Sequence, residues 1–308
     1  MRTCAIVNPA AGGGRVRRLW SALAPRLRGM VPNLTVKWTT APGDATALTR
    51  AAVRSGAERI VAVGGDGTLH EVVNGFFATD GTPLSPAPVL TPLACGTGSD
   101  FRRGLGVPAA PAALERLSAP RTRSVDLLRV AYTSAAGERA YRYALNVVSM
   151  GLSGRVVHRL QRDRGLLPFA RLRYVEALLR VLAAHRPFRA ALEVDGTPVP
   201  ASALHLVAAA NGPSFGAGLR IAPDAVLDDG RLDVTVLHDV SALALLGRLH
   251  HFYRGTHPSL RGVTTRRGRR LRIRPRQAAP VLVEADGELL GRLPATVETM
   301  PDALRLQY

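Results

Sequence analysis

The first 120 residues alternate short apolar runs with amphipathic segments, and this alternation restricts the fold more than any other feature of the chain. The apolar runs, which predict strands, lie at 3–9, 34–40, 59–63 and 87–93. The segments between them have helical spacing and lie at 14–28, 44–56 and 68–77. A strand–helix–strand order is typical of a parallel sheet with helices on both faces, so the sequence predicts an α/β domain.

The pattern changes near residue 120, where short apolar stretches follow one another and several are joined by Asp-Gly turns. Such a succession is typical of a mainly antiparallel β-sandwich. One long helical stretch, 153–185, interrupts the strands, and its arginines and leucines fit either a helix packed on the core or an element facing a membrane. We therefore expect two domains, 1–122 and 123–292, with 293–308 returning to the first.

Three glycine-rich loops each come directly after a predicted strand, at 7–15, 64–68 and 95–101. In a parallel sheet the carboxyl ends of the strands meet at one edge, so these loops should lie side by side. Glycine lets the backbone approach a ligand closely, and the N–H groups at the start of a helix favour phosphate. The loops predict a phosphate-binding edge, although a glycine turn between strand and helix also occurs for packing alone.

One of these loops carries an acidic residue, Asp66, inside the string Gly-Gly-Asp-Gly-Thr. A carboxylate next to phosphates is repelled unless a divalent cation lies between the two. The sequence therefore predicts a cation near Asp66.

Other acidic or hydroxyl side chains stand where helix caps are expected: Asp44 before the second helix, and Ser99 or Asp100 in the third loop.

Together these segments resemble the catalytic domain of the diacylglycerol kinase family, which bacterial lipid kinases share with sphingosine and ceramide kinases. The resemblance lies in "IVNPAAGGG" (6–14), "VAVGGDGTLHEVVNG" (61–75), "LACGTGSDF" (93–101), "IAPDAVLDDGRLDVTVL" (221–237) and "VEADGELL" (283–290), and covers nearly the whole chain. It implies that the α/β domain is of the type found in NAD kinases and diacylglycerol kinases. Two positions depart from the family pattern: Ala94 stands where proline is usual, and Ser99 where asparagine is usual.

The resemblance implies that ATP, together with Mg²⁺, is the phosphoryl donor. It places the nucleotide against Asn8, Thr40, Gly64, Gly65, Asp66, Gly67, Thr68, Leu69, His70, Gly96 and Thr97. Asp66 would act through Mg²⁺ or through an ordered water, which agrees with the cation that its charge predicts.

The resemblance also implies that the triplet Asp-Gly-Glu at 286–288 is the catalytic segment. Glu288 would be the general base, with Asp286 its neighbour near the metal, and Asp66 completes the expected catalytic set. A lipid hydroxyl has a very high pKa and needs a positioned carboxylate to take its proton during phosphoryl transfer. Without the other motifs, the triplet would predict only a hairpin turn with a solvent-facing glutamate.

The segment 226–231 resembles a structural Mg²⁺ site of bacterial family members. There, the carboxylate of Asp229 and the backbone carbonyls of Val226 and Arg231 would hold the ion, since a hard cation takes such oxygen ligands. An ordinary Asp-Gly turn explains the same residues equally well.

The chain of 308 residues has a formal net charge of +18, and Lys37 is its single lysine. This charge fits attraction to an anionic membrane or nucleic acid, or an arginine-rich composition without a function. Aromatic residues make up only 5%, which disfavours a single-stranded nucleic acid site, so we expect no specific nucleic acid partner. No apolar run approaches the roughly 20 residues that cross a bilayer.

We therefore expect an ATP-dependent kinase that phosphorylates a hydroxyl of diacylglycerol or a related lipid. It would be a cytoplasmic protein, peripheral at the inner face of the membrane, and the family suggests a homodimer through the second domain. One alternative is a NAD kinase-like phosphotransferase. NAD kinases share the string Gly-Gly-Asp-Gly-Thr, but at the second loop they have an Asn-Glu motif that is not found in this chain. The other is a non-catalytic basic relative that binds membranes or nucleic acid.

Overall fold

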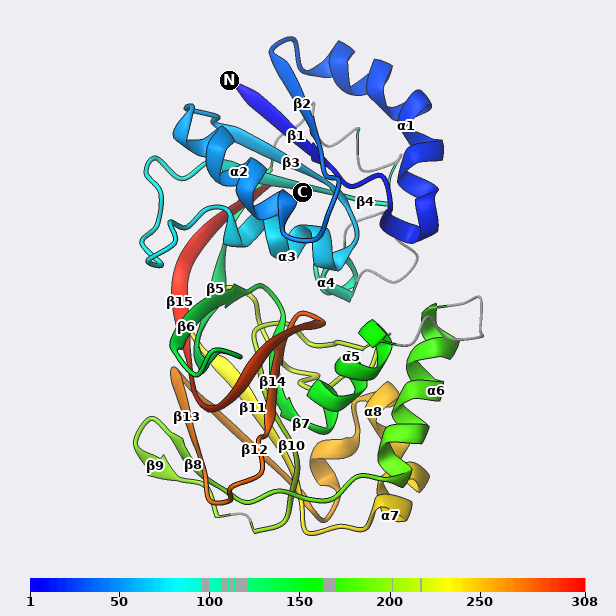
Figure 1. Ribbon diagram of the computed structural model, residues 1–308, viewed down its shortest axis with the longest axis vertical. Helices are drawn as coiled ribbons and strands as arrows, with labels where there is room; N and C mark the ends of the chain where they lie inside the picture. The colour runs from blue at the N-terminus through cyan, green and yellow to red at the C-terminus, as the bar shows by residue number, and fades with distance from the viewer. Residues whose placement is uncertain are drawn as a thin grey trace. The chain divides into compact units, whose positions relative to one another are not determined.

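Two units make up the computed structural model (Figure 1). The residues that it describes are 1–95, 100–106, 110, 114, 121–162, 170–200, 202–216 and 218–307. The first unit comprises Met1–Val125 and Asp302–Tyr308, and the second comprises Asp126–Pro301. The chain thus passes between units at Val125 and Pro301, whereas the sequence predicts boundaries at 122 and 292.

The first unit holds a parallel sheet in which the strand order is β4-β3-β1-β2. Its elements are β1 (Thr3–Val7), α1 (Ala11–Met30), β2 (Leu34–Trp38), α2 (Asp44–Arg54), β3 (Arg59–Gly64), α3 (Asp66–Asn74), β4 (Val89–Ala94) and α4 (Asp100–Gly104). Helix α1 lies on one face of the sheet, and α2 and α3 lie on the other (Figure 1). The predicted α/β domain with parallel strands is therefore confirmed.

Helices on both faces explain the continuous apolar runs of these strands. Val7 and Val63 join an apolar cluster with Leu23 of α1, and Ile6 and Ile60 are fully buried as well. A parallel strand covered on both sides has no polar face, so its sequence shows no alternation. Glycines 12–14 have positive φ values, and the regular part of α1 follows them, close to the start at residue 14 that the spacing predicts.

The second unit is rich in strands. Its strands are β5 (Thr122–Thr133), β6 (Arg139–Ala144), β7 (Val147–Gly151), β8 (Ala190–Val194), β9 (Thr197–Pro198), β10 (Leu204–Ala210), β11 (Leu232–His238), β12 (Val263–Gly268), β13 (Arg270–Pro275), β14 (Leu282–Ala285) and β15 (Glu288–Gln307). Its helices are α5 (Leu152–Arg162), α6 (Ala170–Ala183), α7 (Ala242–Gly247), α8 (Leu249–Arg254) and the 3₁₀ helix η2 (His257–Ser259). The strand pairings described within this unit are antiparallel, as the sequence predicts.

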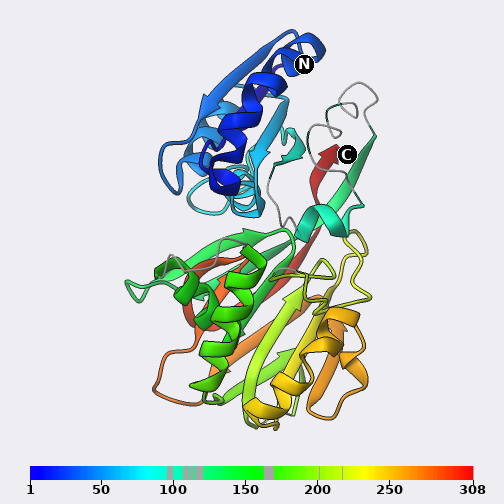
Figure 2. The same cartoon turned by 90° about the vertical axis from the view of Figure 1, so that its right-hand side faces the viewer.

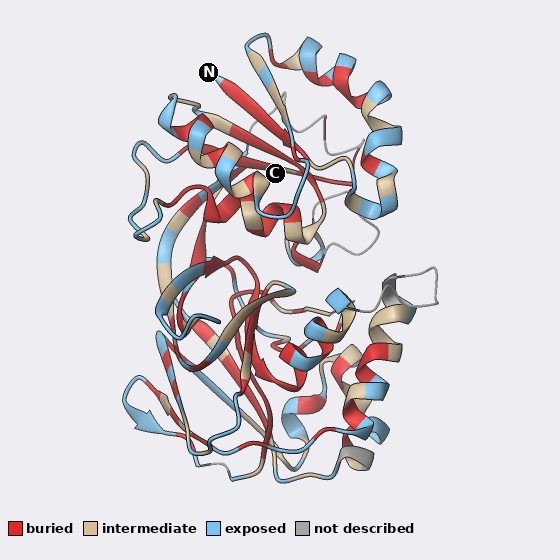
Figure 3. Cartoon of the chain, viewed as in Figure 1, coloured by how far each residue is buried: buried red, intermediate tan, exposed pale blue. Residues whose placement is uncertain are grey.

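Two apolar clusters support the second unit. One fills the space between strands and includes Val148, Val207 and Ile273. The other lies between the strands and the helices, where Leu206 and Leu178 meet. Figure 2 shows the helices along one face of the strands, and Figure 3 shows that buried residues follow the strands and the inner sides of the helices. None of the described helices is long and apolar enough to span a bilayer.

Strand β15 belongs to both units. Within the second unit it pairs with β14, β13 and β5. Near its end, Leu306 pairs in parallel with Leu90 of β4. Thr91 Oγ1 donates a hydrogen bond to Oε1 of Gln307 (2.8 Å), and both side chains are buried. The sheet of the first unit is thus extended by a segment that follows the second unit in the sequence.

Candidate functional site

The parallel strands of the first unit end at one edge of the sheet. The register pairs Val7 of β1 with both Trp38 of β2 and Val63 of β3. Asn8 directly follows β1, and Gly65 directly follows β3, which ends at Gly64. Parallel sheets bind ligands at this edge, so the first two glycine-rich loops have the location that a phosphate site requires.

The turn from β3 into α3 combines a crowded glycine with an open one. A Cβ on Gly64 would lie 2.4 Å from Oγ1 of Thr68, so the packing here excludes a larger residue. Gly65 has an extended backbone (φ −106°, ψ −169°), and a Cβ there would meet no described atom within 4 Å. The described part of the chain therefore does not require glycine at 65. The N–H groups at the amino end of α3, beside Gly65, are of the kind that favours a phosphate group.

Asn8 connects the end of β1 to this turn. Its Nδ2 donates to Thr68 Oγ1 (3.0 Å), and its Oδ1 accepts from the backbone N–H of Ala10 (3.1 Å). These bonds hold the first glycine-rich loop against the second. The convergence of loops that the strand order predicts is therefore present for these two.

Asp66 has a structural partner that the sequence did not indicate. Its Oδ2 accepts a hydrogen bond from the backbone N–H of Asp100 (2.9 Å), at the first residue of α4. Asp100 is itself buried and forms an ion pair with Arg103. The acidic residue of the glycine loop thus has a role that needs no cation, because it holds the start of α4 against the turn after β3.

Thr40 lies after β2, and a local carboxylate binds it. Its backbone N–H and its hydroxyl both donate to Oδ2 of Asp44, each at 2.7 Å, and these bonds lower the pKa of Asp44. Asp44 does not cap α2 as expected, since the helix begins at Asp44 itself. Glu71 caps it instead, because its carboxylate accepts from the N–H groups of Gly43 and Ala45 (2.9 and 3.0 Å).

Other residues expected at the nucleotide have different environments. The side chain of His70 is only 3% exposed, and its Nε2 lies 3.3 Å from Nδ2 of Asn74. His70 could therefore reach a ligand only through its backbone. Leu69 lines a small pocket beside Gly65 and Phe101. Two further expected residues, Gly96 and Thr97, lie outside the described residues.

In the second unit, the first two residues of the Asp-Gly-Glu triplet form the turn of the β14–β15 hairpin. Asp286 and Gly287 both have positive φ (49° and 87°), as in a type I′ turn. The carboxylate of Asp286 accepts hydrogen bonds from the backbone N–H groups of residues 145–147 at 2.8 to 3.0 Å. Asp286 thereby anchors the turn, which the sequence did not indicate. Glu288, half-buried, begins β15 directly after this anchored turn.

At the expected structural metal site, an arginine pairs with the carboxylate. Oδ2 of Asp229 forms an ion pair with the guanidinium of Arg267, and Oδ1 accepts from the backbone N–H of Arg231 (3.0 Å). The guanidinium already supplies the positive charge that a cation would bring to Asp229, Val226 and Arg231. The Asp-Gly turn accounts for these contacts, and the structural metal site stays a prediction.

A large apolar pocket lies within the second unit, between strands β10 and β11 and the helices α5 to α8. Its lining is made almost entirely of leucine, isoleucine, valine and phenylalanine, with Ser153 and Tyr174 as the polar residues. Leu179 of α6 and Leu246 of α7 line the pocket and are also 39% and 41% exposed, so they mark its opening. The chemistry of this lining suits an apolar ligand.

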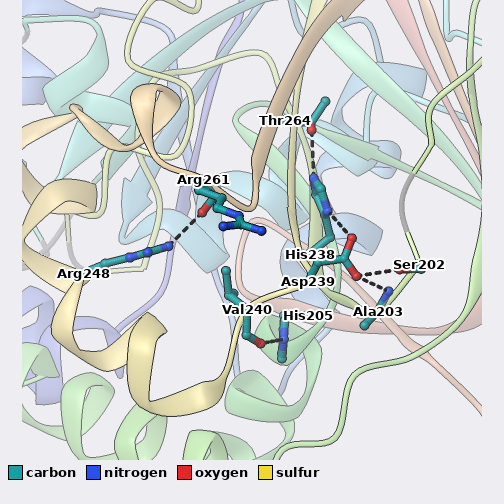
Figure 4. A network of polar contacts seen from close by, with 9 residues as sticks. All are labelled: Ser202, Ala203, His205, His238, Asp239, Val240, Arg248, Arg261 and Thr264. Carbon is teal, nitrogen blue, oxygen red and sulfur yellow. Dashed lines mark hydrogen bonds and ion pairs between the residues drawn. The ribbon is translucent and has the colours of Figure 1, made fainter.

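A separate polar network lies at the end of β11 (Figure 4). His238 contacts Asp239 through Nδ1 and Thr264 through Nε2, both at 2.8 Å. Hydrogen bonds from Ser202, His238 and Ala203 hold the pKa of Asp239 far below its usual range. The network ties the connections of β10, β11 and β12 together, and it involves none of the expected site residues.

Comparison with known families matches both halves of the chain. The diacylglycerol kinase catalytic domain matches residues 2–130, and the YegS C-terminal NAD kinase beta sandwich-like domain matches residues 146–308. A curated relative, "Diacylglycerol kinase" of Mycobacterium tuberculosis, is 29% identical over 307 residues, covering 99% of this chain and 94% of the relative. Another, "Probable lipid kinase YegS-like" of Stenotrophomonas maltophilia, is 30% identical over 284 residues, covering 91% and 88%.

Solved structures share the fold. A diacylglycerol kinase of Bacillus anthracis superposes with a TM-score of 0.72 at 23% identity, covering 100% of this chain and 96% of the other. Yeast NADH kinase in complex with NADH superposes with a TM-score of 0.54 at 13% identity, covering 100% and 82%. At these identities the similarity concerns the fold, which is common to both kinds of kinase.

Proposed function

Because this chain belongs to the diacylglycerol kinase family, we propose that it transfers the γ-phosphoryl group of ATP to a hydroxyl of diacylglycerol or a related lipid. Family membership makes it a kinase that uses a nucleotide. The observation that supports a lipid acceptor is the apolar pocket of the second unit. NAD is a polar acceptor that needs many hydrogen-bonding groups, so this pocket favours a lipid over the NAD kinase-like alternative.

The first unit would bind the nucleotide. Its phosphates would lie beside Gly65, where the amino end of α3 favours negative charge and no described side chain intrudes. Mg²⁺ would arrive with these phosphates and neutralise charge that develops during transfer. The carboxylates of Asp66 and Asp286 accept backbone hydrogen bonds, so we assign no step of the reaction to a metal held by them.

Glu288 would accept the proton of the acceptor hydroxyl. As the hydroxyl oxygen bonds to the γ-phosphorus, the bond from that phosphorus to the bridging oxygen breaks, and the proton moves to the Glu288 carboxylate. The products are ADP and the phosphorylated lipid. The support for this role is positional, since Glu288 follows a turn that Asp286 anchors to residues 145–147.

We further propose that the protein works as a peripheral protein at the inner membrane face. Leu179 and Leu246 stand exposed at the pocket opening, where a lipid chain could pass from a bilayer into the pocket. The net charge of +18 would attract the protein to anionic lipids.

The test is transfer of radiolabelled phosphate from ATP to a panel of dispersed lipids that includes diacylglycerol, monoacylglycerol, ceramide and sphingosine, with NAD as the control acceptor. We expect label in at least one lipid and none in NAD. Glu288→Gln should lower this transfer by about 10² to 10⁴-fold while ATP binding, measured by calorimetry, persists. Transfer to NAD alone, or full activity of Glu288→Gln, would contradict the acceptor or the base, respectively.

A further inference from the structure

Glu284 is a buried carboxylate that the reaction described above does not use. It lies on β14, two residues before the Asp-Gly turn, and is 1% exposed. In the sheet it stands directly opposite Ser149 of β7. Burying a carboxylate costs free energy unless it is hydrogen-bonded, so its partners indicate its role.

Both oxygens of Glu284 have partners near the turn. Oε2 accepts from the backbone N–H of Gly287 (3.0 Å), the second central residue of the turn. Oε1 accepts a short hydrogen bond from the hydroxyl of Ser149. The turn is therefore held by two carboxylates. Asp286 accepts hydrogen bonds from the backbone N–H groups of residues 145–147, and Glu284 accepts one from the N–H of Gly287.

The hydrogen bonds continue from Ser149 to the apolar pocket. The hydroxyl oxygens of Ser149 and Ser153 are 2.6 Å apart. Each hydroxyl has one proton, so both contacts are satisfied when Ser153 donates to Ser149 and Ser149 donates to Glu284. Ser153 also lines the pocket, which it shares with leucines of α6 and α7. A continuous path thus joins the pocket wall to the turn that precedes Glu288.

Close packing of α5 on β14 keeps this path short. A Cβ on Gly154 would lie 2.8 Å from Cβ of Leu282 and 3.1 Å from its carbonyl oxygen. Glycine therefore lets the first turn of α5 approach the strand that carries Glu284. A larger residue would move the helix, and Ser153 with it, away from the strand.

We propose that Glu284 is a positioning residue for Glu288, acting through the Asp-Gly turn, and that Ser149 and Ser153 connect it to the lipid pocket. The proposal rests on the function proposed above for the pocket and for Glu288. In this arrangement the same hydrogen bonds hold one wall of the acceptor pocket and the turn that precedes Glu288. Both must be in place before an acceptor hydroxyl can meet Glu288 in a reactive geometry.

The kinetic test compares Glu284→Gln and Ser149→Ala with Glu193→Gln, a matched control on β8 that is half-buried and outside this network. Glutamine keeps the size of the side chain but cannot accept hydrogen bonds at both positions. We expect Glu284→Gln to lower kcat by about 10 to 100-fold, with the KM for ATP unchanged, because a misplaced base affects the chemical step. Ser149→Ala should cause a smaller loss, and Glu193→Gln none. A normal kcat in Glu284→Gln would overturn the proposal.

Ser153→Ala tests the end of the path at the pocket. It is expected to raise the KM for the lipid while leaving the KM for ATP unchanged, because the residue lines the pocket. Unchanged lipid kinetics in this variant would remove Ser153 from the proposed path.

Hydrogen exchange measured by mass spectrometry gives a readout that does not depend on activity. Glu284→Leu removes every acceptor from this side chain, so loss of the bond to the Gly287 N–H should speed exchange in peptides covering 284–290, while β10 and β11 keep their protection. Wild-type exchange in 284–290 would show that Glu284 does not hold the turn. A wild-type protein that phosphorylates no lipid would defeat the proposed function, but the exchange experiment would still decide the role of Glu284.

Discussion

Asp44, Glu71, Asp66 and Asp286 each hold a loop by accepting hydrogen bonds from backbone N–H groups. Hydrogen bonds to a charged acceptor are shorter and stronger than neutral ones, so they suit loops that must keep one shape. Two of the acids that a motif assigns to chemistry, Asp66 and Asp286, are therefore also supports of the backbone. For such residues, removing the charge and removing the hydrogen bond are different experiments.

Asp66 is the residue at which this distinction is sharpest. Asp66→Asn keeps an oxygen that can accept from Asp100 N–H, so we expect the melting temperature to stay close to that of the wild type. Asp66→Ala loses the bond and should destabilise the protein by about 1 kcal/mol. On the interpretation that the Asp66 charge also faces the Mg²⁺ that arrives with the phosphates, we expect both variants to bind Mg·ATP at least about tenfold more weakly. Normal Mg·ATP affinity of Asp66→Asn in calorimetry would leave Asp66 with the supporting role alone.

His185 makes stability depend on pH. Burial lowers its pKa to about 4, with the neighbouring His205 and Arg155 adding to the effect. Between pH 6.5 and 4 the unfolded chain binds a proton at this position and the folded protein does not. The stability due to neutral His185 is therefore complete above pH 6.5 and is lost as the pH falls towards 4.

His185→Leu should remove roughly 2 to 3 kcal/mol of the difference in unfolding free energy between pH 7 and pH 4.5. Leucine should be tolerated, because neither ring nitrogen of His185 has a hydrogen-bond partner among the described residues. Urea unfolding of both proteins at the two pH values measures the effect. An unchanged pH dependence in the variant would assign the effect to other groups.

At the scale of elements, the β3–α3 turn joins two glycines with different requirements. Gly64 is needed because Thr68 packs against it, whereas Gly65 faces space that the described chain leaves open. Glycine at position 64 is thus required for folding, whereas the open space at position 65 concerns the binding of a ligand. A matched pair of substitutions separates them.

Gly64→Ala should destabilise the protein by about 1 to 3 kcal/mol, because its Cβ would overlap the Thr68 side chain. Gly65→Ala should leave the unfolding free energy nearly unchanged but raise the KM for ATP, because the methyl group would occupy the space expected for phosphate. Chemical unfolding and ATP kinetics on both variants check this pair. Normal ATP kinetics in Gly65→Ala would place the nucleotide elsewhere.

The strands of the first unit can be predicted from the sequence, because buried parallel strands have continuous apolar sequences. The runs 59–63 and 87–93 differ by only one or two residues from β3 (Arg59–Gly64) and β4 (Val89–Ala94). The supports of the site were not predictable in the same way. Asp286 binds N–H groups of residues 145–147, and backbone N–H groups leave no mark in the sequence.

For the molecule as a whole, charge and apolar exposure make separate contributions to membrane binding. We expect sedimentation with vesicles rich in phosphatidylglycerol but weak binding to phosphatidylcholine, since the net charge is +18. Binding should fall as salt rises from about 0.05 to 0.5 M, because the Debye length shortens. Binding that is indifferent to salt would contradict the role of charge.

The apolar contribution is tested at the pocket opening. Leu179→Gln combined with Leu246→Gln should raise the KM for a lipid presented in vesicles. Leu172→Gln, an exposed leucine of α6 outside the pocket lining, is the control. An equal effect of Leu172→Gln would mean that the helix surface, rather than the opening, meets the bilayer.

The path of β15 also sets the order in which the protein can be assembled during synthesis. Residues 302–307 complete the sheet of the first unit, yet a ribosome makes them only after the whole of Asp126–Pro301. The nascent first unit therefore waits with the edge of β4 unpaired until its last strand arrives. An exposed strand edge attracts other chains, so this interval is when a chaperone would protect the protein and when aggregation would begin.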